Sequence, residues 1–175
     1  NYTVPYKAMI CSTGRLGHAT LLGSYSVTSV KKEWCLMFDG TYGQYSTQFF
    51  GIYLFHSICY TAPEPSTMLA QEYNMLGGVA SLGCVRLQTA DAKWIYDNCA
   101  PGTRVTIYDS DEPCPLGKPE RAVDVVPADC GWDPTDPRAE NPWTQVPVEE
   151  IQLSQEELEL QAGDAAALEA VCLPE

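Results

Sequence analysis

Polar and apolar positions alternate along most of the first 110 residues, and a period of two is typical of half-buried antiparallel strands. Several of these runs are also rich in aromatic and β-branched residues, which favour strands. The predicted strand regions are residues 3–14, 21–30, 33–38, 41–60 and 103–110. Turn-forming pairs such as Asp39-Gly40 separate them. The pattern therefore predicts a mainly β fold.

One segment of this region has a helical pattern instead. Thr89 is placed to cap a helix over about residues 90–98, and Asp91 suits the positive end of its dipole. The apolar residues that share one face of this helix are Ala92, Ile95 and Tyr96. Residues 61–78 lack a clear period and contain two prolines and two glycines, which indicates a loop with about one helical turn.

The rest of the chain has a different composition. Residues 111–147 are rich in proline and aspartate, which predicts a linker or extension and not a core element. Residues 148–175 hold two short alternating runs on either side of Ala162-Gly163. The same tail is rich in Glu, Leu and Ala, so residues 154–171 can also be interpreted as a helix.

Charge is divided unevenly between these regions. The 175 residues carry a net charge of −13. Residues 1–108 hold seven lysines and arginines against six acids, whereas residues 109–175 hold three against seventeen. Neither part has the basic surface that nucleic acid or anionic lipid requires, so no nucleic-acid partner is expected. The acidic part is interpreted as a solvated surface.

The cellular compartment has to be inferred indirectly. No run of about 18 apolar residues predicts a membrane span, no signal peptide is recognisable, and the chain does not begin with Met. The chain has eight cysteines without a Cys-x-x-Cys pair, and its two histidines are His18 and His56. This composition argues against a zinc site and favours an extracellular chain with some cysteines paired.

Cys84 and His56 are the candidates for catalytic chemistry. Cys84 follows Gly83, whose missing side chain lets a ligand approach the backbone, and His56 lies near the end of an apolar strand pattern. A cysteine becomes a nucleophile when a histidine and nearby N–H dipoles activate it. From the residues alone, the structural alternatives are favoured: a buried or disulfide-bonded Cys84 and a core His56.

The segments "LFHSICY", "ASLGCVRL", "DAKWIYDN" and "GTRVTIYD" together resemble the L,D-transpeptidase catalytic domain of bacterial cell-wall enzymes. That family's signature is a His, a spacer, and then Ser/Thr-His-Gly-Cys with Arg or Asn two residues after the Cys. The residues of this chain that match it are His56, Ser81, Gly83, Cys84 and Arg86. The resemblance covers about residues 4–110 and favours catalysis over the structural alternatives.

Two departures from the signature affect the site. Leu82 stands where the family has its second His, which puts the tuning of the cysteine in question but leaves the Cys–His pair present. The spacer, residues 57–80, is longer than the short form of the pattern. The added loop is interpreted either as a passive surface or as a substrate lid.

The resemblance implies a β-sandwich of two packed sheets, with a short helix after the cysteine motif and with Cys84 and His56 converging at one edge. It also implies acyl transfer on peptidoglycan stem peptides. Cys84 would attack the carbonyl between the third residue, a diamino acid, and the terminal D-Ala of a tetrapeptide stem. A thioester would form, and the side-chain amine of a second stem would resolve it into a 3→3 cross-link.

The resemblance also implies a role for each site residue. His56 is the general base, and the Ser57 backbone carbonyl orients it. The N–H groups of Gly83 and Cys84 hold the oxyanion. Arg86 either binds a stem carboxylate or braces the loop. Ser81 is expected to hydrogen-bond within the loop, next to the substrate. No metal or organic cofactor is needed.

Two other functions stay open. The same site could release D-Ala to water, as an L,D-carboxypeptidase, or the domain could be an inactive peptidoglycan-binding module. Carbapenem-type β-lactams are the inhibitors that the resemblance implies, and an extracellular, cell-wall-associated location is the one expected.

The resemblance divides the chain into three parts. Residues 1–110 form the catalytic domain, expected to lack the family's first strand; residues 111–147 form the linker or extension; and residues 148–175 resemble the start of a bacterial immunoglobulin-like repeat. In that repeat the strand pattern would come from Ile151, Leu153, Leu158, Leu160, Leu168 and Val171. The catalytic domain is therefore expected to come from a longer surface protein.

A nucleophilic Cys84 leaves seven cysteines for at most three disulfides. Cys114 and Cys130 flank a Pro-rich loop that a disulfide would stabilise by roughly 3 kcal/mol. Cys35 and Cys59 are the second predicted pair, because their strands are candidate neighbours.

Overall fold

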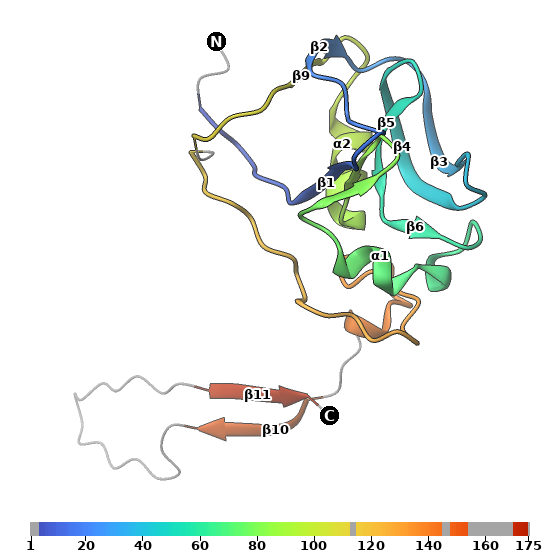
Figure 1. Ribbon diagram of the computed structural model, residues 1–175. Coiled ribbons are helices and arrows are strands. Elements are labelled where there is room, and N and C mark those ends of the chain that lie inside the picture. Colours follow the sequence, from blue (N-terminus) through green and yellow to red (C-terminus); the bar gives the residue numbers. More distant parts are fainter. Residues whose placement is uncertain (1–3, 113–114, 145–147, 154–169, 175) are drawn as a thin grey trace.

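The structure is a computed structural model that describes residues 4–112, 115–144, 148–153 and 170–174. It confirms the mainly β fold (Figure 1). The main sheet has seven strands in the order β3-β4-β5-β8-β1-β7, with β6 also paired to β4. Their bounds are Cys11–Gly14 for β1, Lys31–Leu36 for β3, Tyr42–Phe50 for β4, Tyr53–Ser57 for β5, Cys59–Tyr60 for β6, Val79–Ser81 for β7 and Val85–Leu87 for β8.

The second sheet is smaller and consists of β2 (Gly23–Ser26) and β9 (Arg104–Ile107), which pair antiparallel. Val27 and Val105 from its ends pack with Phe49 of β4 and Val85 of β8 in one buried cluster. The two sheets therefore share a core, as the predicted sandwich requires. Within the main sheet β5 and β8 run parallel, whereas β3, β4 and β5 form an antiparallel meander.

The helix after the cysteine motif, α2 (Thr89–Asn98), lies where the sequence predicts it. Ala92 is buried, and Ile95 and Tyr96 pack on the same cluster. The predicted cap is wrong: Gln88 is the N-cap and its side chain makes no cap hydrogen bond. The Thr89 N–H and Oγ1 instead donate to Asp133 Oδ2 at 2.9 and 3.0 Å. A carboxylate from a distant segment therefore caps the helix.

Residues 61–78 hold more structure than the single turn that the sequence predicts. A 3₁₀ turn, η1 (Pro65–Thr67), is followed by α1 (Ala70–Asn74). Tyr73 of α1 is fully buried and packs with Ile58, Tyr60 and Met68 in the largest apolar cluster of the described residues. The long spacer, residues 57–80, is therefore anchored in the core from Ile58 to Leu76.

Residues 121–144, which we call the strap, correct the prediction that this region holds no core element. Val126 is 1% exposed and belongs to the same cluster as Tyr73. Its backbone pairs with the Asn74 side chain: Val126 N–H donates to Oδ1 at 2.8 Å and Asn74 Nδ2 donates to Val126 O at 2.9 Å. Figure 1 shows this yellow-to-orange segment running from below β9 to lie under α1.

The strap also packs closely against the spacer. The Met68 N–H donates to Gly131 O at 2.7 Å, and a Cβ on Gly131 would lie 1.8 Å from Ser66 O. Asp133, Asp136 and Asn141 are buried, and the strap ends at a second 3₁₀ turn, η2 (Pro142–Thr144). Its polar side chains satisfy backbone groups, so no apolar period marks the segment as buried.

The tail forms two strands, β10 (Val148–Leu153) and β11 (Ala170–Pro174), which pair antiparallel with Ile151 opposite Cys172. Strands are thus present where Ile151, Leu153 and Val171 were expected on strands. The alternative helix lies mostly outside the described residues, as do residues 154–169. The immunoglobulin-like repeat stays a prediction.

The predicted Cys35–Cys59 disulfide is wrong. Both cysteines lie opposite Gly43, but on the two sides of β4, so two strand spacings, about 10 Å, separate them. A disulfide requires Cα atoms within about 7 Å. The free cysteines of the described residues are Cys11, Cys35, Cys59, Cys84, Cys99 and Cys130. Cys114 lies outside the described residues.

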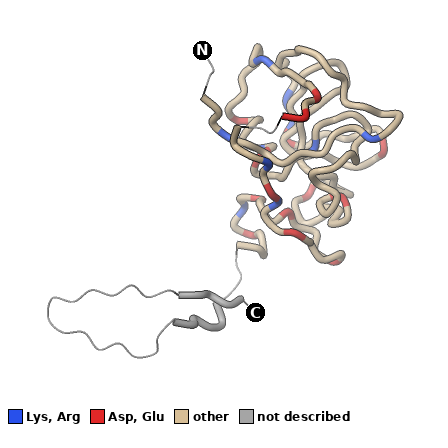
Figure 2. Tube along the Cα trace, turned by 60° about the vertical axis from the view of Figure 1, so that its left-hand side comes forward, with Lys and Arg blue, Asp and Glu red and all other residues tan. Residues whose placement is uncertain are grey.

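The positions of the basic residues and the lengths of the helices bear on two further expectations from the sequence. Figure 2 shows Lys and Arg positions spread over the main body and not gathered on one face. Among the described residues, no helix has the length and apolar character that crossing a bilayer requires.

Candidate active site

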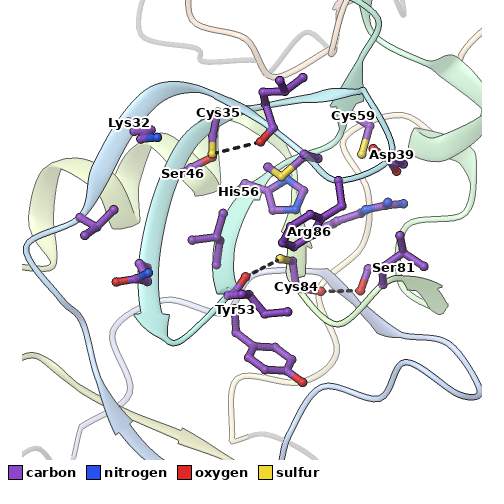
Figure 3. A pocket seen from close by; sticks show the side chains of 18 of the residues that line it. Lys32, Cys35, Asp39, Ser46, Tyr53, His56, Cys59, Ser81, Cys84 and Arg86 are labelled. Carbon is purple, nitrogen blue, oxygen red and sulfur yellow. Dashed lines mark hydrogen bonds between the residues drawn. The ribbon is translucent and has the colours of Figure 1, made fainter.

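A cavity of about 280 Å³ opens on one face of the main sheet, between the β3–β4 hairpin, the β4–β5 turn and the loop before β8. Cys84 and His56 both line it, and Figure 3 shows their side chains pointing into it. His18, the other histidine, is exposed and outside its lining. The structure thus brings together the two residues that the sequence assigns to catalysis.

Strand register explains why these side chains meet. Lys32 of β3 lies opposite Ser46 of β4, and His56 of β5 lies opposite Arg86 of β8. The β4–β5 register, continued by one pair beyond Thr47 and Phe55, brings Ser46 opposite His56. Residues directly opposite one another in a sheet point to the same face. Cys84 stands two residues before Arg86 and therefore shares that face. A row of side chains across four strands forms the floor of the site.

Loop 82–84 holds Cys84 through hydrogen bonds at each side. Ser81 Oγ donates to Cys84 O at 2.6 Å and accepts from the Gly83 N–H at 3.0 Å. Thr20 Oγ1 donates to Gly83 O at 2.8 Å. Gly83 has φ +122°, and a Cβ there would lie 2.8 Å from the ring of Tyr53. The tight turn requires glycine and fixes the cysteine at the cavity wall.

These bonds correct one predicted role. The Gly83 N–H, assigned to the oxyanion hole, donates to Ser81 Oγ and is not free in this structure. Ser81 has the geometry of a loop hydrogen-bonder. Leu82, which replaces the family's second His, is 39% exposed and lines the same cavity as Cys84 and His56.

The Cys84 group is a thiol at rest. Burial raises its pKa, and a hydrogen bond with the Leu54 backbone and the charge of Arg86 only partly offset that effect. Its Sγ donates weakly to Ile52 O at 3.7 Å. A raised pKa means that the thiol has to give its proton to a base before it can attack.

His56 is a suitable base because it is neutral. The side chain is 2% exposed, and burial together with the charge of Arg86 lowers its pKa to about 4. A hydrogen bond with the Ser57 backbone and the charge of Asp39 act in the opposite direction. Nδ1 of the ring is buried and has no hydrogen-bond partner. At least one ring nitrogen of the imidazole is therefore not occupied by a hydrogen bond and can accept a proton. The orienting role of the Ser57 carbonyl stays a prediction.

The position of the His56 ring depends on a missing side chain. A Cβ on Gly43 of β4 would lie 2.7 Å from His56 Nδ1 and 2.4 Å from Met37 Cε. Nearby Tyr45 has φ 51°, a conformation rare for a residue with a large side chain. Beyond Tyr45 the even-numbered Ser46 and Gln48 line the cavity, whereas before it the odd-numbered Gly43 is the residue whose Cβ would point at the His56 ring. The strained residue therefore changes which positions of β4 face the site.

Arg86 is already paired. It is 7% exposed, and its Nη1 donates to Glu72 Oε2 of α1 in an ion pair. Of the two roles that the sequence leaves open, the geometry favours bracing: Arg86 connects the sheet beside His56 to the inserted helix. Sequence reasoning missed Glu72, because nothing in the spacer marks which of its acids faces the site.

The rim of the cavity is apolar and the site holds no metal cluster. Exposed side chains at the rim are those of Val30, Leu36, Phe38, Ile52 and Leu82. Within the described part of the chain, no three His, Cys, Asp or Glu side chains are grouped so that they could hold a metal ion. The thiol and the neutral imidazole together provide a nucleophile and a base for acyl transfer.

The sequence of the chain is similar to those of known proteins. A family model described as "L,D-transpeptidase catalytic domain" matches residues 2–107. The chain is 35% identical over 92 residues to "Putative L,D-transpeptidase YciB" of Bacillus subtilis strain 168, covering 51% of this chain and 46% of that protein. The chain thus spans less than half the length of this relative.

Solved structures give similar matches over just over half of the chain. A fused Zn-dependent amidase/peptidase/peptidoglycan-binding domain-containing protein from Clostridium acetobutylicum is 33% identical, with a TM-score of 0.41, covering 56% of this chain and 38% of that one. An L,D-transpeptidase from Mycobacterium tuberculosis H37Rv is 28% identical, with a TM-score of 0.46, covering 58% of this chain and 42% of that one.

Proposed function

The chain belongs to the L,D-transpeptidase catalytic domain family, and from that premise we propose that it cross-links peptidoglycan through a thioester on Cys84. The observation that carries the proposal is the cavity that Cys84 shares with a neutral His56. The buried thiol with its raised pKa can donate a proton, and the imidazole nitrogen without a hydrogen-bond partner can accept it.

The first half of the reaction is acylation. Cys84 Sγ attacks the carbonyl between the diamino acid and the terminal D-Ala of a tetrapeptide stem, while its proton passes to His56 Nδ1. The carbonyl oxygen becomes an oxyanion, for which the Cys84 N–H is the assigned donor; the Gly83 N–H joins it only by leaving Ser81 Oγ. The C–N bond then breaks, the departing D-Ala amine takes the proton from His56, and a thioester remains.

The second half transfers the acyl group. The side-chain amine of a second stem attacks the thioester carbonyl and gives a proton to neutral His56. The C–S bond breaks, the thiolate takes the proton back, and a 3→3 cross-link is released. The Ser57 backbone holds the imidazole through both halves, so the same nitrogen can serve both proton transfers.

A site of this kind also reacts with water. With water as acceptor the enzyme would be an L,D-carboxypeptidase, which releases D-Ala without a cross-link. The apolar rim of the cavity favours a peptide acceptor over bulk water. The inactive-module alternative is not favoured, because Cys84 and His56 point into one cavity although Leu82 stands in place of the second His.

The test is a product analysis of the protein incubated with disaccharide-tetrapeptide. Mass spectrometry should find D-Ala release together with a dimer cross-linked between two diamino acids, and Cys84→Ala should give neither. Release of D-Ala with monomer alone would assign the carboxypeptidase, and no release at all would reject both activities.

Inhibition and location follow from the same proposal. Carbapenem-type β-lactams would acylate Cys84, because their strained carbonyl takes the place of the stem carbonyl. Peptidoglycan stems are outside the cell membrane, so an extracellular, cell-wall-associated protein is the one proposed.

A further inference from the structure

Two cations line the cavity, and only one of them, Lys32, is exposed. Arg86 is buried and paired with Glu72. Lys32 is exposed, lines the same cavity from β3, and forms no ion pair among the described residues. A buried guanidinium that already has a carboxylate partner is a poor receptor for a second one, whereas a free ammonium at a cavity wall attracts an anion.

Lys32 also stands at the right place relative to the nucleophile. It belongs to the cross-strand row with Ser46 and His56 and lies two strands, about 10 Å, from His56. Lys32 lines the cavity with a long flexible side chain, and Figure 3 shows it on the side of the cavity opposite Asp39. An anion held by Lys32 therefore lies beside the reacting centre and not on it.

The opposite end of the cavity carries the opposite charge. Asp39 lines it at the β3–β4 turn, where Oδ1 accepts from the Thr41 N–H at 3.1 Å and from Thr41 Oγ1 at 2.7 Å. These bonds help to keep the carboxylate ionised and lower its pKa. A carboxylate would be repelled at this end and attracted at the Lys32 end. The two charges favour one of the two directions in which an anionic peptide could lie across Cys84.

We propose that Lys32 binds the C-terminal carboxylate of the donor peptide, the group that departs with the leaving amino acid. The proposal rests on the proposed function, because it concerns the donor of that same site. The ammonium then assists acylation and not the later transfer, since the carboxylate has left once the thioester forms. The enzyme would prefer peptides with a free C-terminus over peptides ending in an amide.

The experiment compares two tetrapeptides that differ only at the C-terminus, a free acid and a primary amide. Acylation of Cys84 is followed by single-turnover mass spectrometry in wild type, Lys32→Met, Lys32→Arg and Lys31→Met. Lys31 is the matched control because it carries the same charge one residue away, with its ammonium directed at Tyr96 and not at the cavity. Thermal unfolding checks that each variant folds.

Wild type should acylate faster with the acid than with the amide, by about tenfold or more, as expected for a charged hydrogen bond. Lys32→Met should remove that ratio, Lys32→Arg should keep most of it, and Lys31→Met should leave it unchanged. If Lys32→Met keeps the wild-type ratio while Cys84 is still acylated, the Lys32 assignment is wrong and the proposed function stands. If neither peptide nor a carbapenem acylates Cys84 in wild type, the proposed function itself fails.

Discussion

His56 and Arg86 are direct partners in the parallel pairing of β5 with β8, so the buried imidazole stands beside a buried guanidinium. Burial, reinforced by that cation, holds the pKa of His56 near 4. The cation is in turn neutralised by Glu72 of α1. The inserted helix therefore influences the base through Arg86 without touching it.

This relationship predicts the acid limb of the pH–rate profile. The acylation rate of Cys84 should fall on acidification only toward pH 4, because His56 stays neutral above its lowered pKa. Arg86→Met combined with Glu72→Gln, which removes the cation and its partner together, should move this limb to higher pH. Stopped-flow acylation measured from pH 4 to 8 tests both, and a limb that does not move in the double variant would contradict the role of Arg86.

The same shift predicts how stability depends on pH. The unfolded chain protonates His56 below about pH 6.5, whereas the folded protein does so only near pH 4. The contribution of His56 to the free energy of unfolding is therefore fully present above pH 6.5, and it is lost progressively as the pH falls from there to 4. Its size is about 3 kcal/mol. Urea unfolding at several pH values measures it, and His56→Gln should flatten that part of the curve.

Gly43 is predicted to be essential for the geometry of the base. Gly43→Ala places a methyl 2.7 Å from His56 Nδ1, so the ring has to move. A displacement of this size should lower acylation by about 100-fold while the protein remains folded. Gly78→Ala is the matched control, since the nearest atom to its Cβ is Met75 O at 3.5 Å and its φ is not in the left-handed region. Equal activity of the two variants would refute this role of Gly43.

Asp133 is predicted to stabilise the fold at a distance from the site. Asp133→Ala removes the acceptor for the Thr89 N–H and hydroxyl at the buried start of α2. The expected loss is about 1–2 kcal/mol in the free energy of unfolding. Asp129→Ala, at an exposed position of the strap, should change it little. Chemical denaturation of both variants decides, and equal stability would show that the strap does not cap the helix.

Only some of the residues behind these predictions could be identified from the sequence. The strands of the meander and the helix after the cysteine were predictable because each leaves a local pattern, a period of two or an amphipathic face. The Cys84–His56 pair was predictable only through the resemblance of its motif to a known family. Glu72 and Gly43 contribute through strand register and helix placement, which no local pattern encodes. Neither was identified from the sequence.

The strap shows the same limit on a larger scale. Its composition predicts a segment outside the core, yet Val126 and Asp133 are buried in the structure. The segment is held by hydrogen bonds between side chains and backbone, as between Asn74 and Val126. Such bonds require no periodic pattern of apolar residues. A segment that is buried without such a pattern cannot be recognised from hydrophobic periodicity.

Peptide mapping by mass spectrometry, after the protein has been incubated with a carbapenem, tests the central claim most directly. We expect one adduct per chain, on Cys84, although Cys35 and Cys59 line the same cavity as free thiols. Cys84→Ala should form no adduct, and His56→Gln should form it much more slowly. An adduct that persists in Cys84→Ala, or that forms equally fast without His56, would show that this pair is not the catalytic centre.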